Sequence, residues 1–506
     1  MLGIKSVSIE DLVECLRKQE LFVEAKAIDP KSKIDQIQTD SRAKTVANTV
    51  FIAIKGNVFD SHQCIDKLQN SDCCPSLFLV DNNDAYLEVK NRPVIKVQNS
   101  RAAWSFVSAL LAGNPQEQLT FYGITGTNGK TSSAWLLRQL LASLGEKVLM
   151  IGTLGIFSDD EIKASSHTTP DPDILFSEFR KALSSGVTTV VMEVSSHAIA
   201  QKKVEPIQFD AVLFTSFSRD HLDFHSSMQD YLQTKVELYQ RLAKSGAKIV
   251  LESKVEAAIR SYGLSTPSDY TTYGLPHETR HSDVTYTLES VTSSGTRFGI
   301  MSTRDTGVQI EFTTALFGNF IIANLVGCLV FFRDKWQEIQ TYVSKLESIP
   351  GRLEPVKNSS CPAQVFIDYA HTPDALDNCL SSLSGMTKNR LFVVFGCGGD
   401  RDKGKRPQMA QVAVEYADTI MITSDNPRTE DPLQIIKEIY AGIPSHMTSS
   451  KIYSEEDRKK AIETVMAMGE DDDVILIAGK GHEEYQIIGN RRLPFSDKSV
   501  VLSFQP

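Results

Sequence analysis

The sequence lacks paired cysteine motifs, an excess of positive charge and long apolar runs, which are typical of secreted, nucleic-acid-binding and membrane-spanning proteins respectively. Its eight cysteines include no Cys-x-x-Cys pair, so neither a zinc knuckle nor a disulfide framework is indicated. We therefore expect reduced thiols in a cytoplasmic protein. Positive charge is scarce: the net charge is −10, which argues against nucleic acid as the main partner. No apolar run approaches the ~20 residues of a membrane span, and the acidic N-terminal stretch predicts no signal peptide.

What is present suits an ordinary globular enzyme. The 506 residues are 41% hydrophobic and 23% charged, and a chain of this length exceeds a single core. Apolar strands alternate with helical segments from about residue 116 onward, which predicts α/β architecture with parallel sheets. We expect three parts: an N-terminal α/β domain over 1–115, a central domain over 116–348 and a C-terminal α/β domain over 349–506.

The stretch "LTFYGITGTNGKTSSAWLLRQLLASLG" (119–145) predicts a phosphate-binding loop between a strand and a helix. The usual G-x-x-x-x-G-K-[ST] pattern is short of one glycine, because Ile124 stands in its place. Glycines let backbone N–H groups approach a polyphosphate, and a helix N-terminus adds positive potential. Lys130 would reach the β- and γ-phosphates and Thr131 would bind Mg²⁺. A plain glycine turn is the alternative, and the order strand, loop and helix disfavours it.

Two further motifs of the central part carry polar side chains. "MEVSSH" places Glu193 at the end of an expected strand, where a carboxylate could bind the magnesium ion or simply be solvated. "RDHLDFH" gathers His221, His225 and neighbouring aspartates, and Lys235 follows on an expected helix. These histidines lack the HExxH pattern of zinc enzymes, so a polar loop is the alternative.

In the C-terminal part, four apolar strands run directly into polar motifs: "QVFIDYAH", "RLFVVFGCGGDRD", "DTIMITSDNPR" and "DDVILIAGKGHE". Ligands of open α/β sheets bind at the carboxyl ends of strands, so these motifs should share one rim. Arginine beside aspartate and glutamate could hold a zwitterion, with guanidinium for a carboxylate and carboxylates for an ammonium. Surface loops with salt bridges are the alternative.

The motifs together resemble one family, the Mur ligases. In order along nearly the whole chain these are "GTNGKTS", "TTPDP", "MEVSSHAIAQKKV", "RDHLDFH", "YLQTKVELY", "GRLEPV", "DYAHTPDAL", "VFGCGGDRDKGKRP", "TSDNPRTEDP" and "AGKGHEEYQ". Within the family the chain is similar to the UDP-N-acetylmuramoyl-tripeptide synthetases. The resemblance implies that the shorter G-x-x-G-K-T loop is normal here. It also implies a UDP-binding domain, a central ATPase domain and a Rossmann-like terminal domain.

The resemblance implies an ATP-dependent acid–amino-acid ligase of peptidoglycan synthesis. ATP would phosphorylate the carboxylate of UDP-MurNAc-L-Ala-D-Glu, and the amine of an incoming amino acid would displace phosphate through a tetrahedral intermediate. Activation is needed because a carboxylate repels nucleophiles, and catalysis is then mostly positioning and charge neutralisation. A monomer that closes on small-molecule substrates is expected.

The site residues follow from the motifs that match. ATP would contact Gly126, Thr127, Asn128, Gly129, Lys130, Thr131 and Ser132, with Asn324, Arg352, Asp368 and His371 around the nucleotide. Magnesium would involve Thr131, Glu193, His221 and Lys235, and the family carbamylates the lysine at the last of these positions. UDP-MurNAc-dipeptide would contact Ser41, Asn57, Val58, Phe59, Thr168, Thr169, Ser195, Gln201 and Lys203. Catalysis is expected from Lys130, Lys235, Glu193 and His221.

The amino acid added would be meso-diaminopimelate rather than L-lysine. Diaminopimelate carries one more carboxylate at its far end, and Arg428 stands where lysine-adding relatives tend to have an uncharged residue. A bidentate arginine–carboxylate pair is stronger than a neutral hydrogen bond. The residues matching the site are Arg401, Asp425, Asn426, Pro427, Arg428, Gly479 and Glu483.

Two departures from the family pattern stand out. Lys203 replaces an arginine, which keeps the charge but not the bidentate geometry. Ile321 replaces the first asparagine of G-x-F-N-x-x-N, which changes how the adenine side is contacted. Two other functions are weighed: a folylpolyglutamate synthetase or different Mur ligase, and a non-catalytic scaffold. The DNPR and EVSSH motifs disfavour the first, and the intact Lys130, Glu193 and Lys235 disfavour the second.

Overall fold

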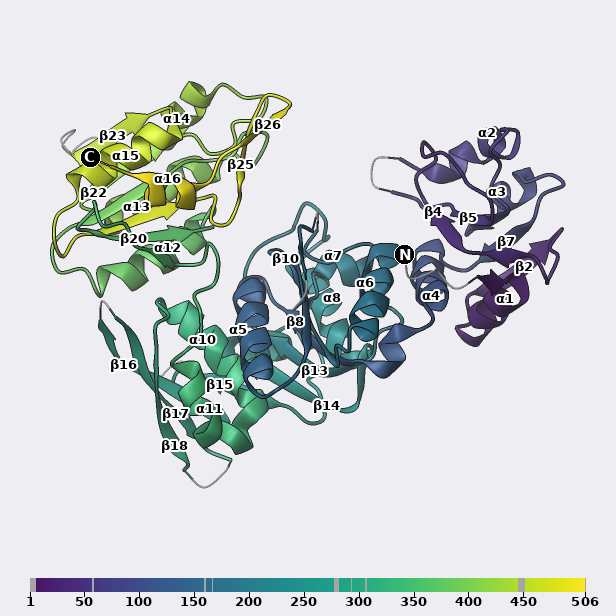
Figure 1. The fold of residues 1–506 in the computed structure, drawn as a ribbon, viewed down its shortest axis with the longest axis horizontal. Helices are drawn as coiled ribbons and strands as arrows, with labels where there is room; N and C mark the ends of the chain where they lie inside the picture. Colours follow the sequence, from purple (N-terminus) through teal and green to yellow (C-terminus); the bar gives the residue numbers. More distant parts are fainter. Residues whose placement is uncertain are drawn as a thin grey trace. The chain divides into compact units, whose positions relative to one another are not determined.

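The computed structural model describes residues 6–56, 59–158, 161–165, 167–276, 282–292, 294–304, 307–444 and 451–505 (Figure 1). The chain divides into two compact units, Met1–Thr272 and Tyr273–Pro506. The three predicted domain boundaries stay a prediction. In the described ranges, every helix is too short or too polar to cross a membrane. All eight cysteines are free thiols.

The first unit begins with a five-stranded sheet whose two faces are both buried. Its strands, in spatial order, are β2 (Phe22–Lys26), β7 (Val94–Val97), β6 (Leu77–Val80), β5 (Thr49–Ile52) and β4 (Gln36–Gln38). Helices α1 (Ile9–Lys18) and α4 (Ser100–Ala112) share a core with Val50 and Ile52. Helices α2 (Ile65–Gln69) and α3 (Asn83–Glu88) share another with Phe51 and Phe78. Covering both faces explains the continuous apolar strands.

The second sheet of this unit is parallel at its centre, as predicted. In spatial order its strands are β9 (Val148–Gly152), β12 (Thr189–Glu193), β8 (Thr120–Thr125), β13 (Phe209–Phe214) and β14 (Ala243–Glu252). Beyond β9 the antiparallel strands β10 (Gly155–Phe157) and β11 (Ile162–Lys163) follow. The helices are α5 (Lys130–Ser143), α6 (Pro172–Ser184), α7 (Ser196–Ala200), α8 (Met228–Gln240) and α9 (Ser253–Ser261). The carboxyl ends of β8, β12 and β13 therefore meet at one edge.

The second unit starts with an antiparallel meander. Strand β15 (Thr271–Gly274) lies at the division and pairs in parallel, through Tyr273 and Gly274, with β16 (Val284–Thr292), the first strand of the meander. Strands β17 (Gly295–Ser302) and β18 (Gln309–Thr314) continue the meander, and α10 (Asn319–Leu329) and α11 (Trp336–Val343) follow. The helices bury Ile322, Leu325 and Trp336.

The C-terminal sheet of this unit has the order β19 (Glu354–Val356), β20 (Gln364–Asp368), β24 (Val474–Ala478), β21 (Leu391–Phe395), β22 (Thr419–Thr423) and β23 (Ile452–Glu455). All pairs except β19–β20 are parallel. Helices α12 (Pro373–Ser384), α13 (Lys405–Tyr416), α14 (Pro432–Tyr440), α15 (Arg458–Met468) and α16 (Asp497–Ser503) connect or follow the strands, and β25 (Tyr485–Ile488) and β26 (Arg491–Pro494) form a hairpin. Because β24 returns to the middle of the sheet, its following loop lies between those after β20 and β21.

Candidate active site

The predicted order of strand, glycine loop and helix is present, with the loop between β8 and α5, and phosphate binding by this loop stays a prediction. Gly126 has φ +151°, and a Cβ there would lie 2.1 Å from the Thr215 hydroxyl, so only glycine fits. Lys130 Nζ donates to the carbonyl oxygens of Gly126 (2.8 Å) and Thr127 (2.9 Å). The lysine thus lies back over its own loop, where its charge is placed for a polyphosphate.

Glu193 ends β12 and is fully buried beside the loop. The Thr131 hydroxyl donates to its Oε2 (3.0 Å), and the backbone N–H of Thr153 donates to its Oε1 (2.8 Å). Gly152 makes room for this carboxylate, because a Cβ there would lie 2.1 Å from Glu193 Oε1. Buried hydroxyl and carboxylate oxygens are the donors that Mg²⁺ prefers, so Thr131 and Glu193 fit the predicted ion.

Lys235, on α8, is 1% exposed and donates to Gly126 O at 2.8 Å. Its Nζ lies 4.8 Å from the ring centre of Tyr231, whose hydroxyl is 3.2 Å from Thr127 Oγ1. Burial, and then the charge of Lys130, lower the pKa of Lys235 well below its usual value. A lysine in such a position has access to its neutral, nucleophilic form.

Three histidine rings meet next to this lysine. His197 lies 4.8 Å from the ring of His221 and 6.0 Å from that of His225. Burial, followed by the charge of His221, lowers the pKa of His197 to about 4. In the described part of the chain, no three His, Cys, Asp or Glu side chains are arranged to hold a metal by themselves. A magnesium site completed by phosphate oxygens does not need three such protein ligands.

Five of the residues predicted for UDP-MurNAc-dipeptide lie around β9, β12 and α7. Thr169 is buried and donates to Glu193 O (2.9 Å), and Thr168 Oγ1 is 3.1 Å from Thr153 Oγ1. Ser195 caps α7 by accepting from Ala198 N (3.1 Å). The replacement Lys203 is buried and pairs with Asp171 at 2.7 Å. Gln201 follows α7 and is partly buried.

Ser41 and Phe59 line a cavity of about 930 Å³ on the N-terminal sheet. Arg42, Lys44 and Lys67 also line it, so cations face a space large enough for a nucleotide. Phe59 is 53% exposed at this cavity. The predicted Asn57 and Val58 lie outside the described residues.

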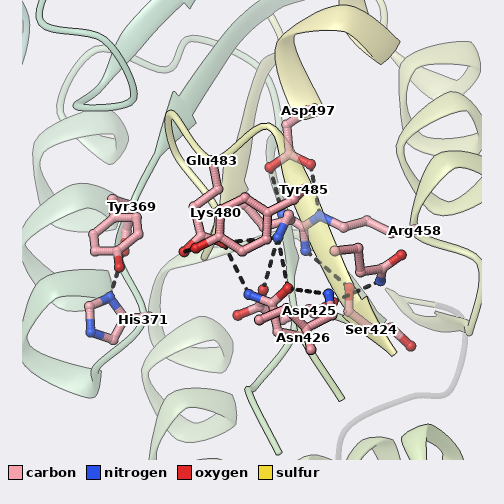
Figure 2. A network of polar contacts seen from close by, with 12 residues as sticks. Tyr369, His371, Ser424, Asp425, Asn426, Arg458, Lys480, Glu483, Tyr485 and Asp497 are labelled. Carbon is pink, nitrogen blue, oxygen red and sulfur yellow. Dashed lines mark hydrogen bonds and ion pairs between the residues drawn. The ribbon is translucent and has the colours of Figure 1, made fainter. Parts of the chain in front are cut away.

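The four polar motifs of the second unit share one rim, as predicted, because β20, β24, β21 and β22 are adjacent and parallel. Figure 2 shows the centre of this rim. Glu483 Oε2 accepts from Lys480 Nζ (3.0 Å) and Asn426 Nδ2 (3.0 Å). Asp425 Oδ1 lies 3.6 Å from Lys480 Nζ. The carboxylates predicted for an ammonium thus lie together, with the Asn426 amide between them.

The predicted cations surround the same rim. Arg428 has φ +50° and its backbone is fixed by β25: its N–H donates to Ile487 O (3.1 Å). Its guanidinium donates to Gly399 O (2.8 Å). Arg401 is exposed and donates to Asp400 O. Gly479 would bring a Cβ to 3.6 Å from Asp425, and Pro427 is buried in the same loop.

A buried ion pair contacts the backbone of this rim. Arg458 and Asp497 are fully buried and 2.7 Å apart. Arg458 also donates to Ser424 O (3.4 Å) and Ala478 O (2.9 Å), which follow β22 and end β24 (Figure 2). The pair therefore fixes the two backbones that present Asp425 and Gly479.

The four residues predicted around the nucleotide all belong to the second unit. Asp368 is buried and accepts from Leu353 N and Ala370 N, both at 2.7 Å, so it shapes its own loop. Burial raises its pKa. Arg352 lies over the Tyr369 ring at 5.0 Å, and His371 Nδ1 is 2.9 Å from Tyr369 O. Asn324 is buried in α10, as is Ile321. Their contacts with ATP stay a prediction.

The sequence did not point to Thr153, and it marked Lys480 and His482 only as members of the polar motif that follows β24. Thr153 binds Glu193 through both its N–H and its hydroxyl. Lys480 is fully buried among the acidic residues of the rim. His482 has a buried Nδ1 without a hydrogen-bond partner among the described residues, and burial lowers its pKa to about 4. All three follow strand ends, and that position was the available signal.

Comparison with known proteins gives consistent matches. The Mur ligase middle domain matches residues 124–332, and the Mur ligase glutamate ligase domain matches 351–481. A UDP-N-acetylmuramoyl-L-alanyl-D-glutamate–2,6-diaminopimelate ligase of Listeria innocua is 37% identical over 92% of this chain and 93% of its own length. One of Coxiella burnetii is 36% identical over 95% and 97%.

Solved structures agree. A structure of a UDP-N-acetylmuramoyl-L-alanyl-D-glutamate–2,6-diaminopimelate ligase matches with TM-score 0.67 and 27% identity over 98% of both chains. A folylpolyglutamate synthase of Mycobacterium tuberculosis matches with TM-score 0.57 and 17% identity over 75% of this chain and 92% of its own. At that identity the second match shows the fold alone.

Proposed function

The chain belongs to the Mur ligase family, and from this premise we propose how two sites divide the work of an ATP-dependent ligase. The enzyme adds 2,6-diaminopimelate to UDP-MurNAc-L-Ala-D-Glu in peptidoglycan precursor synthesis. The phosphate-loop site activates the dipeptide carboxylate, and the rim of the second unit selects the amino acid. The observation that carries the proposal is the contact of Thr131 with buried Glu193 beside Lys130.

The first step transfers the γ-phosphoryl group. A carboxylate oxygen of the dipeptide attacks phosphorus, the bond to the β-phosphate oxygen breaks, and ADP leaves with that electron pair. Lys130 is placed to balance the charge that spreads over the transferring oxygens. Because the carboxylate becomes an acyl phosphate, its carbon accepts a nucleophile.

The second step forms the amide. The amine nitrogen attacks the acyl carbon, a tetrahedral intermediate forms, the C–O bond to phosphate breaks, and the nitrogen loses its proton. Catalysis requires the amine and the acyl carbon to be held in a reactive arrangement. Water must also be excluded, because it would hydrolyse the acyl phosphate.

Magnesium is proposed to bind at Thr131 and Glu193, with His221 and a carbamylated Lys235 as further ligands or neighbours. When bound, the ion neutralises phosphate charge. Carbamylation joins the neutral amine of Lys235 to the carbon of CO₂ with loss of one proton from Nζ, so a neutral group becomes an anion; starting from the ammonium, two protons are released in total. It needs the neutral amine, and the lowered pKa of this buried lysine supports its presence. The charge of Lys130 would stabilise the carbamate.

The nucleotide-sugar substrate is proposed to place its UDP end in the cavity lined by Ser41 and Phe59, whose cations suit a diphosphate. The dipeptide would extend toward Thr168, Thr169 and Lys203. The amino acid is proposed to be the meso isomer. Its distal carboxylate would pair with Arg428, and its distal ammonium would lie at Asp425 and Glu483.

We further propose that the enzyme works in the cytoplasm as a monomer. Its substrates would be small molecules, with no nucleic acid or membrane partner. The net charge of −10 supports the exclusion of nucleic acid.

The test is an assay of phosphate release with each substrate omitted in turn. The product is identified by mass spectrometry. We expect release only when ATP, UDP-MurNAc-L-Ala-D-Glu and an amino acid are all present. A non-catalytic scaffold would release none. A ligase of another branch would instead accept a different nucleotide precursor or a folate, and either result would reject the proposal.

A further inference from the structure

Lys480 is a fully buried lysine that the reaction described above does not use. It follows β24 between Gly479 (φ +113°) and Gly481 (φ +52°). This left-handed turn points its side chain inward, toward the loop that follows β22 (Figure 2). Burying an ammonium is costly, so a position like this is retained only where the charge is compensated.

The ammonium of Lys480 touches three groups of the proposed amino-acid site. Its Nζ donates to Glu483 Oε2 (3.0 Å) and Asn426 Oδ1 (3.2 Å) and lies 3.6 Å from Asp425 Oδ1. The Tyr485 ring centre is 5.5 Å away. The lysine is therefore on the buried side of the residues that would receive the distal ammonium, away from solvent.

Most hydrogen-bonding groups of the Asn426 side chain are engaged in these and neighbouring contacts. Its Oδ1 accepts from Lys480 and from Ile487 N (2.9 Å), while its Nδ2 donates to Glu483. One N–H of the amide is left. Asn426 thus connects Lys480, Glu483 and strand β25 through hydrogen bonds.

The acceptors that remain are few and fixed. Glu483 Oε1 accepts from Tyr485 OH (3.3 Å), so three of the roughly four acceptor positions of this carboxylate are occupied. Asp425 Oδ1 is buried and accepts no hydrogen bond within the described residues. A ligand ammonium would therefore meet one open acceptor position on Glu483, beside the negative charge of Asp425, whose Oδ1 faces Lys480 Nζ at 3.6 Å. Their relative placement depends on Lys480.

We propose that Lys480 is a positioning residue for amino-acid selectivity. By direct contact and through Asn426, it holds the carboxylates of Asp425 and Glu483 so that they fit the distal ammonium of meso-diaminopimelate in one configuration. This rests on the proposed function of the rim. With Arg428 holding the distal carboxylate, the fixed acceptors read the stereochemistry of the distal carbon.

An ion pair at the opposite end of the same strand, with its aspartate buried and its arginine 36% exposed, provides the control. Asp473, just before β24, is buried and pairs with Arg390 Nη2 at 2.7 Å. This pair is remote from the rim, because strand β24 separates the two ends. Arg390→Gln should lower thermal stability without changing the Michaelis constant (KM) of any substrate.

The experiment compares Lys480→Met and Lys480→Gln with Arg390→Gln and the unmutated enzyme. Steady-state kinetics are measured for ATP, UDP-MurNAc-dipeptide, meso-diaminopimelate and LL-diaminopimelate, with melting curves for each protein. Losing a charged hydrogen bond corresponds to roughly 10- to 100-fold in binding. We expect KM for meso-diaminopimelate to rise by about that factor. The KM values for ATP and for UDP-MurNAc-dipeptide should stay within about twofold.

Discrimination between the meso and LL isomers should fall by about tenfold or more in both Lys480 variants. Gln can still donate one hydrogen bond, so its effect should be the smaller. An unchanged isomer ratio, a uniform loss with all substrates, or melting of both variants below assay temperature would overturn the proposal. If the unmutated enzyme does not use diaminopimelate at all, it is the proposed function that fails.

Discussion

Glu193 and Lys235, the buried charges beside the phosphate loop, are held by hydroxyl groups and backbone atoms. The buried charges of the C-terminal rim instead hold one another, as Lys480 and Glu483 do. The first arrangement leaves charge open to a substrate whose own charge changes during reaction. The second fixes acceptors in advance for a ligand that only has to be recognised. We therefore expect variants of the first site to lose turnover and variants of the second to lose selectivity.

The largest effect should come from Lys130→Ala. Without this cation the transferring phosphate loses its point charge, and turnover should fall by about a thousandfold or more. Binding of the UDP substrate, measured by calorimetry, should survive because its proposed cavity lies elsewhere. Lys181→Ala, which removes a half-exposed partner of Glu178, is the control. A kcat close to normal in Lys130→Ala would remove the basis for the phosphate-loop assignment.

Lys235→Ala should lose activity by about a hundredfold or more, because the site lacks its anion. Short carboxylates such as acetate should restore part of the rate by imitating a carbamate. Lys235→Arg, which cannot be carbamylated, should be inactive and should not respond. Equal behaviour of the two variants toward acetate would contradict carbamylation, as would an unmodified lysine in crystals of active enzyme equilibrated with CO₂.

Arg428→Asn tests the selectivity that we expect of the C-terminal rim. Arg428 is half-buried, and losing a hydrogen bond to a charged group costs about 1.5–3 kcal/mol, which corresponds to roughly 10- to 100-fold. The preference for diaminopimelate over lysine should fall by about that factor, while turnover at saturating diaminopimelate changes far less. Arg492→Asn, which removes the cation 3.6 Å above the Tyr485 ring, is the control. A preserved preference in Arg428→Asn would show that selectivity lies elsewhere.

The smallest effect concerns pH and should be shared by both units. The pKa of His197 and that of His482 are each lowered to about 4, whereas an unfolded histidine titrates near 6.5. The unfolded chain therefore binds more protons between these values, and the free energy of unfolding should fall as pH drops from about 6.5 to 4.

Each histidine should contribute on the order of 1 kcal/mol after solvent screening. His197→Gln and His482→Gln should each flatten the pH dependence of the melting temperature. A slope as steep as in the unmutated protein would mean that the histidine is not held neutral by the fold.

Much of this arrangement could be predicted from the sequence. Strand, glycine turn and helix over 119–145 predicted the phosphate loop, and four strands running into polar motifs predicted the rim. Both depend on local pattern and on where parallel strands end. The pairing of Lys480 with Asn426 and Glu483 could not be predicted, because it depends on the return of β24 to the middle of the sheet. The contact of Thr153 with Glu193 likewise joins two strands that are neighbours only after folding.

The most direct test of the central claim, that the rim selects the amino acid, is a competition assay. The unmutated enzyme receives meso-diaminopimelate and L-lysine at equal concentration, with ATP and UDP-MurNAc-L-Ala-D-Glu, and the products are separated by mass spectrometry. We predict that the diaminopimelate product exceeds the lysine product by about tenfold or more. Comparable incorporation of lysine would contradict the account.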